Sequence, residues 1–339
     1  MKTKKSLLLT LLTGTMLLSS CSISKKTIGL FMYDAADTFL ASLSNAIVDR
    51  LDNDYLIKVY DSESSQLIQN RQIVDAIDNN EINTLIINMV DRLSSGTIVQ
   101  KAKQKQIPII FYNREPVKSD IQGYNNIYYV GSSPVQEGTN QANMAMNLMV
   151  DPHHISNIID KNGDNVLQCV FIRGEQSHQD TELRTYSCIN TLIENGYELE
   201  ILDMQYGDWS RNKGYDIMQK YYSLYGDKIE FVFSNNDDMA LGAVDYLLEE
   251  KVFTSGLKAV EQPFPIVGVD GTTVGINAIK DGLLYGTTVN DTEKQADAIH
   301  ELIKLINKEI TIKDFSYTLT DNYYVYISGK IITGPSVVE

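Results

Sequence analysis

Short apolar runs alternate with longer amphipathic stretches along most of this chain. Residues 27–33 form an apolar run that predicts a buried strand, and apolar side chains then recur every four residues from Phe39 to Leu51, which predicts a helix. Further strands are predicted at residues 55–60, 84–89, 107–112 and 127–131, with helical patterns between them. Parallel strands need long crossover connections, so this alternation indicates an α/β fold built on a parallel sheet.

The same alternation starts again after a polar segment at residues 151–165. Strands are predicted at residues 166–173, 198–204, 230–234 and 265–269, and a helical pattern follows each of them. We therefore expect two similar α/β units rather than one long sheet. The length of 339 residues agrees with two domains of ordinary size.

Residues 1–20 have the features of an export signal. Three lysines precede an apolar stretch at residues 7–18, which is too short for a permanent membrane-spanning helix. The stretch ends in Leu-Ser-Ser-Cys, which resembles a bacterial lipoprotein cleavage site. The resemblance implies that Cys21 becomes a lipid-carrying N-terminus and that residues 21–26 form a short tether. Ordinary signal cleavage close to Cys21 is the alternative.

The charge of the chain narrows its possible partners. The formal net charge is −15, and loss of residues 1–20, with three lysines and no acidic residue, takes it to −18. So much negative charge repels phosphate backbones, which excludes nucleic acid as an expected partner. It also disfavours broad binding to anionic lipid, which leaves Cys21 as the expected membrane anchor.

Polar side chains collect where the predicted strands end. Ligands of open parallel sheets bind at the carboxyl ends of the strands, so the residues that follow strands are candidates for a binding site. Eight of them are polar, namely Asp37, Asn113, His178, Asp180, Arg184, Asn236, Asp270 and Asn290, and two are aromatic, Phe39 and Trp209. Planar polar groups hydrogen-bond hydroxyls in pairs, and aromatic rings can cover the faces of a pyranose. The set therefore favours an uncharged polyol such as a sugar over a phosphate.

Each of these residues also has a simpler interpretation. Asp37 and Asp270 precede predicted helices and could be N-caps, and Asn113 stands before a proline turn. Phe39 and Trp209 could pack within their own units. The gathering of ten such residues at one predicted rim nevertheless favours a ligand site.

Six segments closely resemble the bacterial galactose/glucose-binding proteins. They include FYNREP at 111–116, NNDDMALGA at 235–243 and GTTVND at 286–291, together with parts of 28–39, 128–131 and 268–270. The resemblance covers nearly the whole chain after the export signal. It implies a periplasmic binding protein type I fold, in which two similar Rossmann-like lobes with parallel sheets are joined by a three-segment hinge.

The same resemblance implies where the chain passes between the lobes. The first lobe would comprise residues 27–131 and 291–317, and the second would comprise residues 132–290 and 318–339. The crossings would then lie near Ser132, Asn290 and Tyr317.

The resemblance also implies what the strand-end residues do. All ten candidates carry the residue type of the family, so the eight polar residues would hold the sugar while Phe39 and Trp209 stack on it. The implied ligand is D-galactose or D-glucose, delivered by a monomeric extracytoplasmic protein to the permease of an ABC transporter. A chemoreceptor is a further candidate partner. Gln179 departs from the family, which usually has proline at this place.

Residues 160–168 carry oxygen-bearing side chains at alternate positions. Positions one, three, five and nine of an EF-hand-like loop offer side-chain oxygens and position seven a carbonyl: Asp160, Asn162, Asp164, Gln168 and Val166. From the residues alone, a polar turn explains the segment equally well. The resemblance favours a structural Ca²⁺, because the calcium loop of the family lies here and its closing carboxylate corresponds to Glu230. Asn165 stands where glycine is usual, and asparagine tolerates the left-handed backbone that is needed.

A secreted glycoside hydrolase is the competing class, since several carboxylates are expected around one sugar. Neighbouring Asn and Arg side chains would hold those carboxylates ionised as acceptors. A cleft that encloses a monosaccharide also leaves no room for a leaving group, so we expect a binder and not an enzyme. Among binders, a ribose- or xylose-type ligand is the alternative to hexose.

Overall fold

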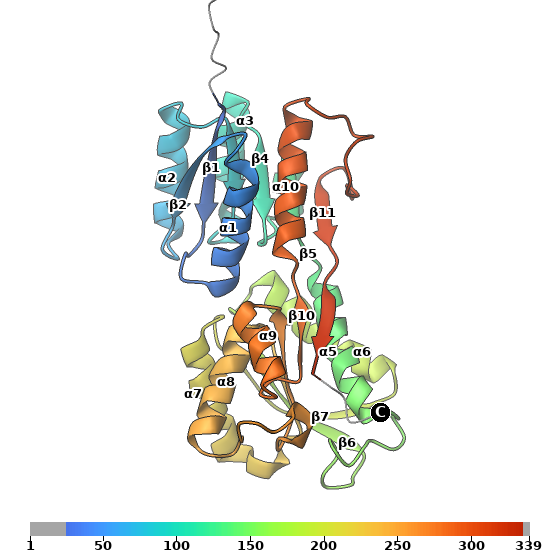
Figure 1. Cartoon of the computed structure of the whole chain (residues 1–339). Coiled ribbons are helices and arrows are strands. Elements are labelled where there is room, and N and C mark those ends of the chain that lie inside the picture. The colour runs from blue at the N-terminus through green and yellow to red at the C-terminus, as the bar shows by residue number, and fades with distance from the viewer. Residues whose placement is uncertain (1–24, 335–339) are drawn as a thin grey trace, which may run out of the picture.

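The computed structural model describes residues 25–334 and shows two lobes, one above the other in Figure 1. The first lobe contains β1 (Thr27–Met32), α1 (Thr38–Leu51), β2 (Leu56–Asp61), α2 (Gln66–Asp78), β3 (Thr84–Ile87), α3 (Ser95–Lys105), β4 (Ile109–Tyr112), α4 (Lys118–Ile121), β5 (Ile127–Ser132), α10 (Thr292–Ile306) and β11 (Tyr324–Ile327). The second contains α5 (Pro134–Met149), β6 (Val166–Arg173), α6 (Gln179–Glu194), β7 (Glu198–Tyr206), α7 (Arg211–Tyr225), β8 (Phe231–Ser234), α8 (Asp237–Glu249), β9 (Ile266–Asp270), α9 (Thr273–Lys280), β10 (Gly286–Val289) and β12 (Lys330–Thr333). Three single 3₁₀ turns lie at Arg92–Ser94, Gly226–Lys228 and Ala259–Glu261.

The two sheets have the same strand order relative to the chain. The first runs β11-β5-β4-β3-β1-β2, and the second runs β12-β10-β9-β8-β6-β7. The paired strands described here are parallel except β12, which pairs antiparallel with β10. In each sheet the first strand, β1 or β6, lies in the interior, with the next strand on one side and the later strands on the other. This reversal of strand order leaves a crevice at the carboxyl ends of the strands. This confirms the predicted α/β fold of two similar lobes.

Helices cover both faces of each sheet and bury its apolar strands. In the first lobe α1 and α10 pack on one face, while α2 and α3 pack on the other. In the second lobe α7, α8 and α9 share one core, and α5 and α6 share the other. Strands β3, β4 and β8 are buried along their whole length, as strands covered on both faces must be. Rigid sheets of this kind hold the residues at their strand ends in fixed positions.

Three segments carry the chain between the lobes. The first lies between β5 and α5, and the second lies between β10 and α10, close to Asn290. The third differs from its predicted place near Tyr317, because β11 pairs with β5 and keeps the chain in the first lobe as far as Ile327. Only Ser328 and Gly329 separate it from β12, which pairs with β10 in the second sheet. The first lobe therefore includes residues 318–327, which the prediction had given to the second.

The predicted signal segment 1–20 and Cys21 lie outside the described residues. Within residues 25–334, no helix is both long enough and apolar enough to cross a membrane.

Candidate ligand-binding site

A polar cavity lies between the lobes, with about 360 Å³ of space between its atoms. Its wall is formed by Tyr33, Asp37, Phe39, Leu40, Asn113 and Arg114 of the first lobe and by His178, Asp180, Arg184, Trp209, Asn236 and Asp270 of the second. Nine of the ten candidate residues from the sequence are therefore brought together around one space.

Asp37 and Asn236 cap helices and line the cavity at the same time. Asp37 Oδ1 accepts a hydrogen bond from the backbone N–H of Leu40 at 2.9 Å, and Asn236 Oδ1 accepts one from Met239 at 2.9 Å. The N-cap interpretation is confirmed for Asp37, and the cap leaves its side chain in the cavity wall. Each cap uses one oxygen and leaves the other polar atom of the group for other partners. Asp270 is not a cap, because Thr272 caps α9.

Asn113 occupies a left-handed backbone conformation, with φ of 58°. Two first-lobe side chains hold it there. Asn88, fully buried, donates to Asn113 Oδ1 at 3.1 Å, and the Tyr129 hydroxyl donates to the Asn113 carbonyl at 2.7 Å. With its oxygen engaged, the Asn113 side chain presents its amide N–H groups as the free donors.

His178 enters the site as a neutral imidazole. Its Nδ1 accepts a hydrogen bond from the backbone N–H of Asp180 at 3.1 Å, so Nε2 carries the proton and is a donor. Burial, with the nearby charges of Arg114 and Arg184, lowers the pKa of His178 well below its usual range. The ring also meets the Trp209 ring edge-on, with the centroids 5.2 Å apart.

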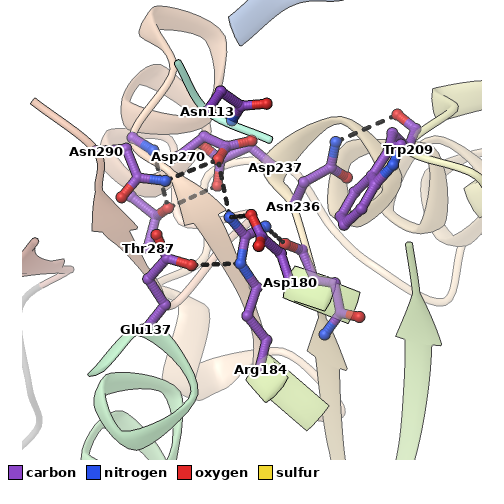
Figure 2. Close-up of polar contacts among 12 residues, drawn as sticks. Asn113, Glu137, Asp180, Arg184, Trp209, Asn236, Asp237, Asp270, Thr287 and Asn290 are labelled. Carbon is purple, nitrogen blue, oxygen red and sulfur yellow. Dashed lines mark hydrogen bonds and ion pairs between the residues drawn. The ribbon is translucent and has the colours of Figure 1, made fainter. Parts of the chain in front are cut away.

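Arg184 is the centre of the second-lobe side of the cavity (Figure 2). Its Nε donates to Glu137, and its Nη1 donates to the carbonyl of Asn235 at 2.6 Å. Its Nη2 lies 3.7 Å from an oxygen of Asp180 and 4.0 Å from one of Asp270. One guanidinium thus faces three carboxylates, all of them buried.

The carboxyl groups of the cavity are held at raised pKa. Burial raises the pKa of Asp180 to about 7 in spite of the opposing charge of Arg184. Burial also raises the pKa of Asp37, and it raises that of Asp270 well above its usual range. A polar ligand that donates hydrogen bonds would favour the ionised forms, because it replaces the lost water.

Asn290 is the one predicted residue that does not line the cavity. Its Nδ2 donates to Asp270 Oδ1 at 3.1 Å, so it orients a cavity residue from behind. The backbone of Asp270 has φ of 111°, a conformation that L-residues rarely adopt, which makes such support necessary.

Several residues of the site were missed from the sequence. Tyr33 and Arg114 line the cavity. Tyr33 is the last residue of a predicted strand and Arg114 follows another, so their positions offered a signal. Glu137 and Asp237 lie behind the wall and are fully buried. Both lie in the first turn of a helix, where acidic residues are common because they interact favourably with the helix dipole, so their sequence context did not single them out.

Polar side chains bridge the two lobes at the mouth of the cavity. Arg114 of the first lobe donates to Glu175 of the second at 2.9 Å and lies over the Tyr33 ring. Gln179, the residue that replaces the usual proline, reaches Glu115 of the first lobe at 3.4 Å. These contacts exist only when the lobes are together.

The predicted calcium loop is tightly folded around its own side chains. Both oxygens of Asp160 accept backbone N–H groups of the loop, at 2.7 and 2.9 Å, and Asn165 has the left-handed φ of 64°. Asp164 Oδ2 lies 2.8 Å from the Asn162 amide and 3.0 Å from the Gln168 amide.

Glu230 closes the loop from the start of the neighbouring strand. Its two oxygens accept from the backbone N–H groups of Lys161 at 2.8 Å and Gln168 at 3.0 Å. Among residues 25–334, no three His, Cys, Asp or Glu side chains form a metal-binding group. A loop of the EF-hand kind also draws on amide and backbone oxygens, and the oxygen-rich side chains gathered here fit the hard ligands that Ca²⁺ requires.

Two doubly wound lobes with a polar cavity between them define the class of two-lobed solute-binding proteins. The chain also matches the family model of the periplasmic binding protein domain over residues 28–309, and it belongs to that family. The family consists of solute-binding proteins, which confirms the expected non-enzymatic class.

Similar proteins support this assignment over almost the whole chain. The D-galactose/methyl-galactoside binding periplasmic protein of Haemophilus influenzae is 32% identical, and the alignment covers 88% of each chain. A ribose import binding protein of the same organism is 25% identical over 84% of this chain and 88% of its own. A solved ABC transporter solute binding protein from Bacillus halodurans with bound myo-inositol has a TM-score of 0.73 at 24% identity, with 91% and 95% of the two chains covered.

The Asp237 carboxyl gives a pH dependence that can be measured. It accepts from Thr272 and Thr287, and burial raises its pKa to about 7, whereas an unfolded Asp titrates near about 3.9. Between these values the folded protein holds a proton that the unfolded chain has lost, so stability decreases as the pH rises through this window. Asp237→Asn cannot titrate. We expect its melting temperature, without ligand, to fall less than that of wild type between pH 4.5 and 7.5.

Asp216→Asn, at an exposed position of α7, is the matched control and should keep the wild-type pH slope. An unchanged slope in Asp237→Asn would contradict the raised pKa of this carboxyl.

Proposed function

We propose that this protein binds D-galactose or D-glucose between its lobes and delivers it to an ABC sugar transporter. The observation that carries the proposal is the single cavity formed by nine strand-end residues of the two lobes. The relative at 32% identity, which carries D-galactose and methyl-galactoside in its name, supports a hexose. The ribose-binding relative, less similar, makes a pentose the alternative.

The distribution of donors and acceptors in the cavity matches a neutral hexose. Asp37 lines the cavity from the first lobe and accepts hydrogen bonds when ionised. The resemblance to galactose/glucose-binding proteins implies that it would receive the 4-hydroxyl in either orientation. Asp180 and Arg184 form a charge-assisted pair on the opposite side, suited to the anomeric hydroxyl, its neighbour and the ring oxygen. Phe39 and Trp209, from different lobes, supply apolar surface for the ring faces.

A bound sugar would also stabilise the closed arrangement of the lobes. Only the closed form places first-lobe and second-lobe side chains around one ligand, so ligand binding shifts the population toward it. The Arg114–Glu175 bridge would form in the same step. A permease, or a chemoreceptor, would then distinguish the loaded protein by its closed shape.

We further propose that the loop 160–168 and Glu230 hold a structural Ca²⁺. The side chains of Asp160, Asn162, Asp164 and Gln168, the carbonyl of Val166 and the carboxylate of Glu230 would supply its oxygen ligands. The ion would tie the segment that precedes β6 to the start of β8. Its role would be stability rather than sugar recognition, because none of these residues lines the cavity.

The expected place of action is outside the cytoplasmic membrane, with Cys21 as the lipid anchor. Both follow from the sequence of residues 1–21, and the periplasmic binding proteins to which the chain belongs support the extracytoplasmic part.

The sugar specificity can be tested by competition among glucose, galactose, 4-deoxyglucose and ribose. Leaving a buried polar group without its partner costs about 1–3 kcal/mol, so loss of the 4-hydroxyl should weaken binding by about ten- to hundredfold. Inversion at position four should matter little. In Asp37→Ala, most of the preference for glucose over 4-deoxyglucose should disappear, as measured by calorimetric titration.

Two control variants separate recognition from folding. Asp37→Ser keeps an N-cap for α1 but withdraws the carboxylate, so it should lose the 4-hydroxyl preference as Asp37→Ala does. Asp34→Ala changes the same loop outside the cavity wall and should behave like wild type. Ribose that binds wild type as tightly as glucose, or an Asp37→Ala protein that still separates the two glucoses, would refute the hexose assignment.

The calcium proposal predicts a change in melting temperature. A ligand that binds only the folded state at one hundred times its Kd stabilises that state by about 2.7 kcal/mol. A chelator should therefore lower the melting temperature of wild type, and neither Asp160→Ala nor Glu230→Ala should respond to calcium. Asp227→Ala, an exposed neighbour of the loop, should respond normally. Identical melting curves with and without chelator would rule out a structural Ca²⁺.

The lipid anchor can be checked by cell fractionation. Cys21→Ala should move the protein from the membrane fraction to the soluble or secreted fraction, whereas Ser22→Ala should leave it in the membrane fraction. If Cys21→Ala stays in the membrane fraction to the same extent as Ser22→Ala and wild type, Cys21 is not the anchor.

A further inference from the structure

Glu137, directly behind the cavity wall, forms a buried ion pair with Arg184, which is part of that wall. Their side chains are 1% and 4% exposed, and Glu137 itself does not line the cavity. One oxygen, Oε2, accepts from Arg184 Nε, and the other, Oε1, is buried without a partner among the described residues. Figure 2 shows Glu137 rising from below toward the guanidinium.

Close packing of two helices brings this pair together. Glu137 lies in the first turn of α5, just after the first crossing between the lobes, and Arg184 lies on α6. The next residue, Gly138, is what permits the approach, because a Cβ there would lie 2.2 Å from the backbone oxygen of Arg184. A carboxylate at position 137 is therefore held at a fixed distance from the guanidinium.

The guanidinium has three nitrogen atoms, and two of them donate hydrogen bonds away from the cavity. Glu137 takes Nε, and the carbonyl of Asn235 takes Nη1. The third nitrogen, Nη2, lies near Asp180 and Asp270, both of which line the cavity. Without Glu137, Nε would lose its hydrogen bond, and the bond from Nη1 to the Asn235 carbonyl would be left to orient the guanidinium from this side.

We propose that Glu137 is a positioning residue of the ligand site, which fixes the rotation of Arg184 so that its Nη2 edge faces the sugar. This rests on the proposed function only in the choice of sugar, because the geometry is the same for any neutral polyol that Arg184 contacts.

Glu137 also adds a negative charge beside the cavity carboxylates. The charged groups that face Asp180 are Arg184, Glu137, Arg114 and Glu115, and the charge of Glu137 helps to raise the pKa of Asp180. Protonation of Asp180 replaces one acceptor position by an O–H donor, so the binding of hydroxyl donors should weaken as the pH falls through this pKa. This decrease in affinity is the acid limb of the pH profile. Removing the charge at position 137 lowers the pKa of Asp180 and moves the acid limb to lower pH.

Two variants separate the effect of the length of the Glu137 side chain from the effect of its charge. Glu137→Asp keeps the charge but is one methylene too short, so binding should weaken by at least about tenfold while the acid limb stays in place. Glu137→Gln keeps the length and loses the charge, so binding should weaken less and the acid limb should move to lower pH. Glu182→Gln is the control, because Glu182 lies on the same helix as Arg184 but pairs with Arg173 away from the cavity wall, and its side chain is 49% exposed. It should change neither quantity.

The measurement is a calorimetric titration between pH 5 and 8, with the polyol that wild type binds most tightly among glucose, galactose, ribose and myo-inositol. If that ligand is not a hexose, the proposed function fails while the test of Glu137 proceeds unchanged. Should one variant fail to fold, the other carries the test through its own readout. Affinities and pH profiles equal to those of wild type and Glu182→Gln would overturn the role of Glu137.

Discussion

The binding cavity depends on one buried cation, the guanidinium of Arg184, surrounded by Glu137, Asp180 and Asp270. Taking charges out of water is costly unless opposite charges and hydrogen bonds replace the lost solvation. Here a single guanidinium serves three carboxylates, and the raised pKa of Asp180 shows that the compensation is incomplete. A ligand that brings hydroxyl donors to these carboxylates supplies part of what burial has removed. The buried charges of the cavity are therefore most stable when a ligand fills it.

Backbone conformation contributes to the same preorganisation. Asn113 and Asp270 both adopt positive φ angles, and each is held by a buried neighbour, Asn88 in the first lobe and Asn290 in the second. Such conformations persist only where surrounding contacts impose them. The site thus has a layer of supporting amides behind the residues that face the ligand. Mutation of these amides would alter the geometry of the site without any change in the residues that face the ligand.

Much of this arrangement could be predicted from the sequence, because parallel strands place their carboxyl ends at one edge. Asp37, Asn236 and Arg184 follow predicted strands, and the fold brings them together for that reason. The third crossing was misplaced, since the pairing of β11 with β5 depends on residues that lie far apart in the chain and leave no local signal. Glu137 was missed for a related reason: its importance arises from the contact of two helices at Gly138, and in the sequence it looks like an ordinary acidic residue in a first helical turn.

The last crossing has a consequence for how the chain acquires its structure. Strands β11 and β12 complete opposite sheets, where they cover the otherwise open edges of β5 and β10, yet only Ser328 and Gly329 separate them. During synthesis the N-terminal segments emerge first, so both sheets keep an unpaired edge until the final stretch of chain is made. Neither lobe can reach its finished form early. Under the proposed export of this chain, this late closure would postpone folding until most of the chain has been made.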